Sequence, residues 1–290
     1  MKTPLLTGLA LVAFAANSVL CRLALGGATI DAASFTSVRL ASGAAVLLFI
    51  SALVNKNSPS DWASPRRRFK FNSALLLFLY AAAFSFAYTN LTAGTGALIL
   101  FGSVQATMLL AALASGERPH PAEWAGLALA VGGLVYLVLP GLAAPPLLGS
   151  ACMAVAGVSW GLYSLAGRGA ADPIAETTGN FVLALPPALA VNLFMYGGAR
   201  VSATGVLFAV LSGGLASGVG YVVWYAALRN LTATRAATVQ LTVPVLAAGG
   251  GVIFMSESVS LRLLVAAALI LGGVALALSV RAQARRAQTT

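Results

Sequence analysis

The sequence predicts an all-α integral membrane protein in which ten transmembrane helices form two inverted five-helix repeats. The first observation is the composition: 59% of the 290 residues are hydrophobic, only 8% are charged, and the mean hydropathy is +0.92. In soluble domains about a quarter of the residues are charged. The second observation is an internal repeat, because Asn-Leu-Thr-Ala occurs at 90–93 and again at 230–233, and the same offset of 140 relates Glu117 to Glu257. A single offset shared by scarce polar residues indicates two copies of one unit.

The first repeat, residues 1–140, contains five apolar runs, each near the length of about 20 residues that a bilayer core requires. The run that starts at Leu5 follows Lys2, as in a signal peptide, but it continues through Leu25, so we expect a retained span. The spans predicted in this half are 4–25, 33–54, 70–89, 94–115 and 121–139.

The second repeat, residues 145–290, follows a short uncharged segment rich in Pro, Gly and Ala. Its predicted spans are 147–167, 177–197, 203–227, 233–254 and 260–280. Pro186-Pro187 and Pro244 lie in the middle of two of them, and because proline removes a backbone hydrogen bond, both helices are expected to kink. Five is an odd number, so the second copy must enter the membrane from the opposite face, as in the inverted repeats of many secondary transporters.

The distribution of Lys and Arg predicts the orientation. Thirteen of the 17 lie on the side of both termini, three lie on the other side, and Arg39 falls inside a span. The positive-inside rule therefore places both termini in the cytoplasm. The basic cluster at 66–70 suits contact with anionic lipid headgroups, and no nucleic-acid partner is expected. We expect a monomer in contact with membrane lipids.

Few residues could support enzyme chemistry. All seven carboxylates map to loops or helix ends, and Cys21, Cys152 and the single His120 form no metal-binding spacing. We therefore predict no metal, no cofactor and no enzyme activity. A carrier is preferred over a channel or passive scaffold, because none of the spans shows a continuous polar stripe, and a membrane-embedded enzyme is the third alternative.

Polar and aromatic residues at intermediate depth are the candidates for substrate binding. The predicted substrate-binding residues are Asn17, Tyr80, Gln105, Trp160, Tyr163, Trp224 and Gln240. An amide in hydrocarbon needs a partner, so the three amides should face the protein interior or a wet cavity. Hydrogen bonding between helices is the alternative for the amides, and an interfacial belt is the alternative for the aromatic residues.

Two further features leave alternatives open. Arg39 could reach outward to the membrane surface, form a structural pair, or bind a carboxylate, because a charge within the bilayer is costly and needs a reason. Gly214 and Gly218 form a small-xxx-small pair, which favours close helix packing over a direct ligand contact.

The chain resembles the EamA-type transporters of the drug/metabolite transporter superfamily over essentially its whole length. The matching residues are Ser115-Gly116-Glu117 with Gly132-Gly133, Ser256-Glu257 with Gly272-Gly273, and Ser159-Trp160-Gly161. One departure is Ala16-Asn17-Ser18, at a place where the family usually has Trp-Gly. Within the family the chain is most similar to the YddG-type exporters of aromatic and other neutral amino acids.

The resemblance implies export of small metabolites from cytoplasm to periplasm by alternating access. Aromatic and other neutral amino acids are the expected substrates, with cationic drugs as a further class. The cavity would open between the two repeats, and the fifth and tenth spans would pack outside it as a scaffold. We interpret Glu117 and Glu257 as helix caps, not as transport residues.

Overall fold

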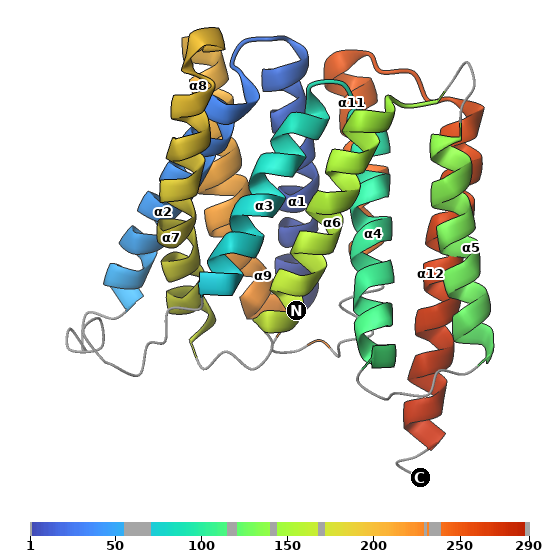
Figure 1. The fold of residues 1–290 in the computed structure, drawn as a ribbon. Helices are drawn as coiled ribbons and strands as arrows, with labels where there is room; N and C mark the ends of the chain where they lie inside the picture. The colour runs from blue at the N-terminus through green and yellow to red at the C-terminus, as the bar shows by residue number, and fades with distance from the viewer. Residues whose placement is uncertain are drawn as a thin grey trace.

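The structure, a computed structural model, describes residues 2–54, 71–114, 121–139, 144–167, 172–228, 231 and 239–287. Nearly all of this part of the chain is helical (Figure 1). The helices are α1 (Lys2–Gly26), α2 (Ala32–Val54), α3 (Phe71–Tyr88), α4 (Ala93–Ala114), α5 (Pro121–Val138), α6 (Leu147–Ala166), α7 (Pro173–Phe194), α8 (Ala203–Val210), α9 (Gly220–Leu228), α11 (Val243–Met255) and α12 (Leu261–Ala287), with the short 3-10 helix η2 (Tyr196–Gly198) and the π-helix η3 (Leu211–Val219).

Within the described residues, six helical segments are long and apolar enough to cross a membrane. They are α1, α2, α3, α6, α7 and the continuous helix of α8, η3 and α9, whose candidate span is Ala203–Ala227. Shorter apolar stretches occur at Ala93–Met108, Trp124–Val138, Val243–Met255 and Leu261–Leu276. The chain is therefore a multi-pass membrane protein, and most predicted spans coincide with helices.

Two predicted spans differ from the structure. The seventh begins at Pro173 and not at 177, because Asp172 caps the helix by accepting a hydrogen bond from the Ala175 N–H and proline is well suited to the first turn. In the ninth, the expectation of a kink at Pro244 is wrong: a turn precedes α11, and Pro244 lies in its first turn, where a missing N–H costs little. Residues 232–238 of this span lie outside the described residues.

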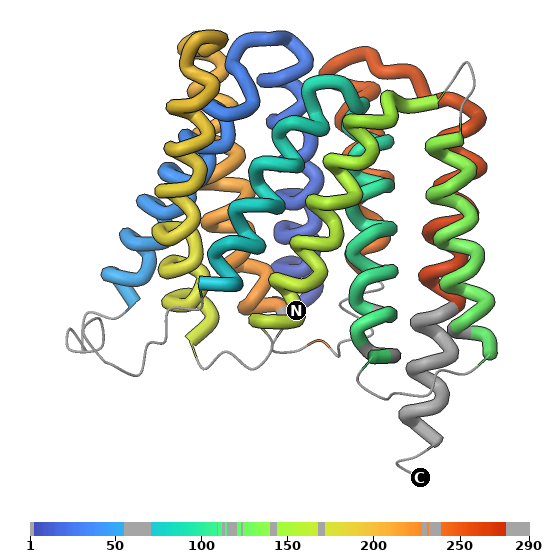
Figure 2. The backbone as a smooth tube through the Cα atoms, in the orientation of Figure 1, coloured from blue at the N-terminus to red at the C-terminus, as the bar shows by residue number. Residues whose placement is uncertain are grey.

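The helices stand side by side; α1 begins at the end of the bundle toward which α12 runs, drawn at the bottom of Figure 2. We call this end the lower end and the opposite one the upper end. Helix α5 packs against α12 at the edge of the bundle beyond α4, as expected for the fifth and tenth spans. The guanidinium of Arg262, at the start of α12, lies 5.6 Å from the ring centre of Tyr136, near the end of α5. The two helices therefore run in opposite directions.

Helix α2 crosses η3 at very short range. A Cβ atom at Gly213 would overlap the backbone carbonyl oxygen of Arg39, so only glycine permits this crossing. Added Cβ atoms at Gly214 and Gly218 would both meet Val46 of α2. The expected close packing at these small residues is confirmed.

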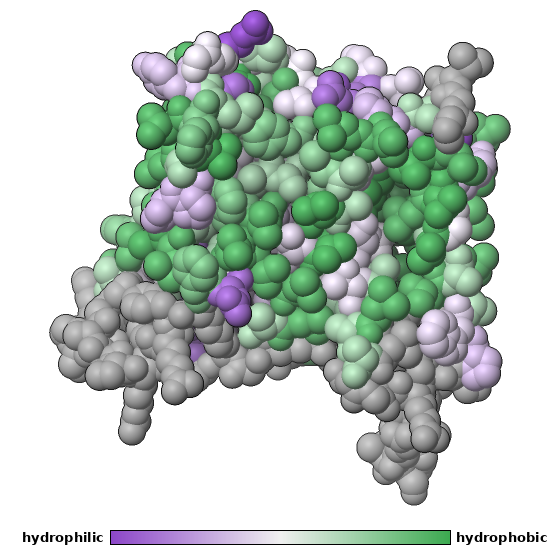
Figure 3. Space-filling view, in the orientation of Figure 1, coloured by the Kyte–Doolittle hydropathy of each residue, from purple (hydrophilic) through white to green (hydrophobic). Residues whose placement is uncertain are grey.

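The surface of the bundle is suited to hydrocarbon. Figure 3 shows a face whose middle is mostly apolar, with hydrophilic residues gathered at the upper end. Large apolar side chains such as Phe49, Leu193 and Ile253 are exposed on the outside of the helices. Exposed apolar surface of this extent is unfavourable in water but not in lipid.

Candidate functional site

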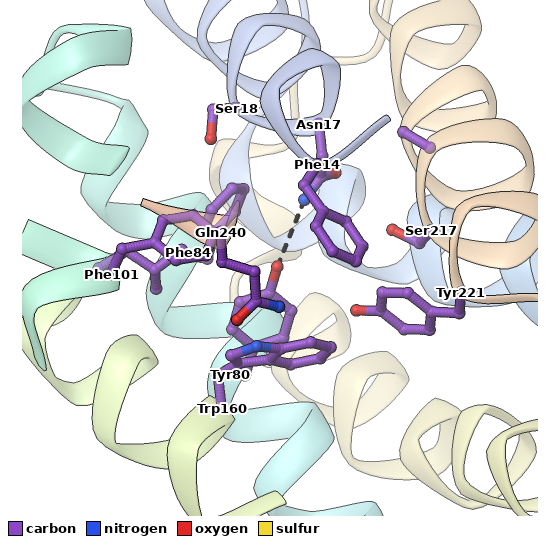
Figure 4. A pocket seen from close by; sticks show the side chains of 12 residues that line it. Phe14, Asn17, Ser18, Tyr80, Phe84, Phe101, Trp160, Ser217, Tyr221 and Gln240 are labelled. Atoms are coloured by element: carbon purple, nitrogen blue, oxygen red, sulfur yellow. Dashed lines mark hydrogen bonds between the residues drawn. The ribbon is translucent and has the colours of Figure 1, made fainter. Parts of the chain in front are cut away.

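A pocket lies inside the bundle at intermediate depth (Figure 4). Its walls come from α1, α3, α4, α6, η3 and α9, together with Gln240. The lining residues are Phe14, Asn17, Ser18, Tyr80, Phe84, Leu100, Phe101, Trp160, Ala216, Ser217, Tyr221 and Gln240. The space open to the centre of a water molecule is about 20 Å³. That space holds a water molecule but not an amino acid, so a substrate requires the walls to separate.

Four of the predicted binding residues meet in this pocket: Asn17, Tyr80, Trp160 and Gln240. They are separated widely in the sequence, and in Figure 4 their side chains converge on one space. Asn17 is buried and Gln240 is partly buried, as expected for amides in a membrane protein.

The other three predicted residues lie elsewhere. Gln105 is buried one helical turn beyond Phe101, and its Nε2 has no hydrogen-bond partner among the described residues. Trp224 does not line the pocket; it packs edge-on against Phe14, with ring centres 5.6 Å apart. Tyr163 is one turn below Trp160, where it lines a second, smaller pocket.

A hydrogen-bond network joins four side chains at the pocket wall. The Ser212 hydroxyl donates to Asn17 Oδ1 at 2.6 Å, and Asn17 Nδ2 donates to the Tyr80 hydroxyl oxygen at 3.3 Å. Arg39 Nη2 donates to the same oxygen at 3.1 Å. The side chain of Arg39 is only 2% exposed, so the alternative in which it reaches outward to the membrane surface is wrong.

Aromatic rings form one wall of the pocket, which we call the aromatic wall. The ring centre of Trp160 lies 4.9 Å from Tyr80, 5.2 Å from Tyr221 and 5.5 Å from Tyr163. Phe84 extends the wall, with its ring centre 5.4 Å from that of Tyr80. Trp160 lines the first pocket and its ring packs against that of Tyr163, which lines a second pocket, so aromatic rings lie between the two.

Several lining residues were absent from the predicted set. They are Phe14, Ser18, Phe84, Leu100, Phe101, Ala216, Ser217 and Tyr221. Helical spacing could have found some of them, because residues three or four apart share a face. Phe84 follows Tyr80 by four positions, and Phe101 precedes Gln105 by four.

The second pocket lies nearer the lower end. It is lined by Ser73, Tyr163, Gly167, Pro173, Glu176, Thr177, Asn180 and Tyr225, and the space open to a water centre is about 10 Å³. Asn180 Nδ2 donates to the Tyr163 hydroxyl at 3.3 Å. Its lining is more polar in character than the aromatic wall above it.

An ion pair connects the two halves of the chain at the upper end. Arg22 Nε donates to Glu257 Oε1 at 3.1 Å, and Arg22 Nη1 donates to the carbonyl oxygens of Tyr88 and Thr89 at 3.2 and 3.3 Å. Glu257 Oε2 accepts the N–H of Ala93, the first residue of α4, at 2.8 Å. The interpretation of Glu257 as a helix cap is confirmed, although the capped helix is α4. Glu117 lies outside the described residues.

Asp31 makes a second connection at the upper end. Its carboxylate accepts the N–H groups of Ser34 at 2.9 Å and Arg200 at 3.1 Å, and its own N–H donates to the Arg200 carbonyl at 2.8 Å. Partial burial raises the pKa of Asp31, but the hydrogen bonds from Ser34 and Arg200 outweigh it and lower the pKa below its ordinary value. This carboxylate therefore stabilises the fold above its unfolded pKa of about 3.9, and the contribution is lost as the pH falls through the lower, folded value.

Comparison with known proteins gives the family. The model of the EamA-like transporter family matches residues 1–139 and 147–279. The chain is 51% identical over 280 residues to the uncharacterized protein PA1977 of Pseudomonas aeruginosa, covering 97% of this chain and 96% of that protein. The crystal structure of a protein that is 23% identical in sequence superposes with a TM-score of 0.64. The match covers 93% of this chain and 95% of that protein's chain, which indicates a common fold. The chain belongs to the EamA-like transporter family.

Proposed function

We propose that the protein is a secondary carrier that exports small metabolites, chiefly aromatic and other neutral amino acids, from cytoplasm to periplasm. Cationic drugs are a further class to test. Membership of the transporter family supports membrane transport in general. The substrate class and the direction rest on the residues of the pocket and on the expected orientation.

The observation that carries this proposal is the composition of the first pocket. Side chains from both halves of the sequence meet there, with amides of Asn17 and Gln240 beside the rings of Tyr80 and Trp160. Amides can hydrogen-bond the ends of a zwitterion, and aromatic rings favour a flat or apolar side chain. Sites at the interface of two repeats near the membrane midplane are usual in secondary transporters.

The proposed architecture has two inverted repeats, residues 1–140 and 145–290. The protein would be a monomer in the inner membrane, with both termini in the cytoplasm. The two stretches matched by the family model, 1–139 and 147–279, are of similar length and support this division. In this orientation the upper end faces the periplasm, where Arg22–Glu257 and Asp31 connect the two halves.

A transport route follows from the stacking of features along the bundle. The second pocket lies toward the cytoplasmic end, the aromatic wall and first pocket lie above it, and the ion pair lies above both. A substrate would pass the wall when Trp160 separates from Tyr221, and would leave when the upper contacts break. One end then opens while the other is closed, as alternating access requires.

Counterflow in liposomes tests the proposal. Vesicles loaded with unlabelled phenylalanine should accumulate labelled phenylalanine only when the protein is present, and uptake should saturate with concentration. The panel should include alanine, tryptophan and a cationic drug. Flux that never saturates would favour a channel, and the lack of exchange for every amino acid tested would refute the proposed substrate class.

A further inference from the structure

We propose that Arg39, together with the Tyr80 hydroxyl, binds the carboxylate of the transported molecule, so that the carrier selects substrates with a free carboxylate. This inference rests on the proposed function and specifies its substrate class. It concerns only the carboxylate end of the substrate, which would bind at the side of the pocket formed by α2 and α3.

Arg39 is a buried positive charge without a counter-ion among the described residues. Within the described residues, the carboxylate of Glu257 pairs with Arg22 and that of Asp31 binds backbone N–H groups, and no carboxylate pairs with Arg39. The guanidinium lies 5.2 Å from the ring centre of Tyr80 and 4.9 Å from that of Phe84. Ring faces offset only part of the cost of removing a charge from water. An anion that arrives with the substrate would complete the pair.

Within the described residues, the hydroxyl hydrogen of Tyr80 is free to bind a ligand. Its hydroxyl oxygen accepts from Arg39 Nη2 at 3.1 Å and from Asn17 Nδ2 at 3.3 Å, and both of these groups are donors. The hydroxyl hydrogen must therefore point elsewhere, and no described residue accepts it. Because Tyr80 lines the pocket, a bound carboxylate can accept this hydrogen while the guanidinium behind it supplies the positive charge.

Buried polar atoms without a hydrogen-bond partner in the described part of the chain lie near the first pocket. Among the described residues, the buried side-chain atoms without a hydrogen-bond partner are Arg39 Nη1, Gln105 Nε2 and Ser217 Oγ. Ser217 lines the pocket, Arg39 contacts two lining residues, and Gln105 is one turn from the lining residue Phe101. Buried polar atoms are normally satisfied, so unsatisfied atoms gathered around one pocket indicate a polar ligand.

A purely structural role for Arg39 makes a different prediction. A guanidinium that only holds α2 against α3 would be expected to use its donors within the protein, but the buried Nη1 has no partner in the described part of the chain. Removing such an arginine would weaken the fold and would therefore reduce the transport of every substrate equally. A carboxylate site instead predicts that the loss depends on whether the substrate carries a carboxylate.

The experiment compares L-phenylalanine with L-phenylalaninamide, which differ only in the carboxylate, and with 3-phenylpropionate, which keeps the carboxylate but lacks the amine. Counterflow and ligand-induced thermal stabilisation are measured on the purified full chain. In the wild type, phenylalanine and 3-phenylpropionate should each bind at least about tenfold more tightly than the amide, because the amide loses a charged hydrogen bond. Arg39→Gln should lower the affinity for phenylalanine to that for the amide, and Arg39→Lys should restore part of the difference.

The matched control is Arg262→Gln, which removes an arginine from α12 at the edge of the bundle and should leave the preference unchanged. Tyr80→Phe keeps the ring but removes the hydroxyl, and it should reduce the preference. If Arg39→Gln does not fold, the wild-type comparison and Tyr80→Phe decide. The carboxylate site is refuted if phenylalanine is exchanged without preference over its amide, or if the preference persists in Arg39→Gln. Neither result would refute the proposed carrier function. Absence of exchange for all amino acids refutes the substrate class of the proposed function.

Discussion

Tyr80 is the residue on which the chemistry of the pocket depends. Its hydroxyl receives hydrogen bonds from α1 and α2, while its ring packs against Trp160 of α6. One side chain thus connects the polar network to the aromatic wall. A shift of α6 that separates the two rings would also disturb the network, so opening of the wall and exposure of the polar groups are coupled.

Trp160→Ala tests the aromatic wall at the residue scale. The variant loses ring contacts to Tyr80, Tyr221 and Tyr163, and each good aromatic contact contributes about 0.5–1.5 kcal/mol beyond burial. Transport of aromatic substrates should weaken about tenfold, since about 1.4 kcal/mol is a factor of ten in affinity. Liposome counterflow with tryptophan and alanine measures the effect. Alanine transport should suffer less, and an equal loss for both substrates would indicate a packing role.

Glu257→Gln tests the contact at the upper end. The variant removes the charge that pairs with Arg22 and weakens the cap on α4, so the free energy of unfolding should fall by about 1–3 kcal/mol. A double-mutant cycle with Arg22→Gln should give a coupling energy of about 1 kcal/mol. Turnover per folded molecule should change less than stability. A variant that folds normally but loses all transport would show that Glu257 acts in transport.

At the scale of elements, the crossing of α2 and η3 positions Arg39. The backbone of Arg39 touches η3 where Gly213 has no side chain, and the same π-helix carries Ser217 into the pocket. The position of the Arg39 backbone, from which the guanidinium extends, is therefore set by a backbone-to-backbone contact.

Gly213→Ala tests that crossing. The added methyl group has no room beside the Arg39 carbonyl, so α2 and η3 must move apart, at a cost of about 1–3 kcal/mol. The matched control is Gly249→Ala in α11, where an added Cβ meets nothing within 4 Å. It should stabilise the helix or leave it unchanged, because alanine is favoured over glycine by about 1 kcal/mol. Thermal unfolding in detergent compares the two, and similar midpoints would contradict the close crossing.

At the scale of the molecule, the orientation can be tested with two exposed residues, Asn72 at the start of α3 and Gly197 in η2. The start of α3 lies at the lower end, and the connection from α7 to α8 lies at the upper end (Figure 1). Each residue is replaced by cysteine in a chain whose Cys21 and Cys152 have been changed to serine. The positive-inside rule predicts that a membrane-impermeant maleimide on intact spheroplasts labels position 197 and not position 72. Labelling of both positions from one side would mean that the predicted number of crossings between them is wrong.

Hydropathy located the helices well, because apolar runs of membrane length leave few alternatives. It could not tell which residues face inward. In a chain this apolar, both the lipid face and the buried face of a helix are hydrophobic. Trp160 and Trp224 looked equivalent in the sequence, yet the first lines the pocket and the second packs against Phe14. Arg39 was ambiguous for a related reason, since its partners Tyr80 and Phe84 come from another helix.

The π-helix η3 has a consequence for how such a pocket changes during evolution. A π-helical turn accommodates an additional residue relative to an α-helix, and in an α-helix each residue turns the chain by about 100°. Deletion of one exposed residue, such as Leu215, would therefore be absorbed by a return of η3 to α geometry, with Tyr221 close to its present direction relative to Ser212. Insertions and deletions in Leu211–Val219 thus offer this architecture a change of length that leaves the lining side chains in place.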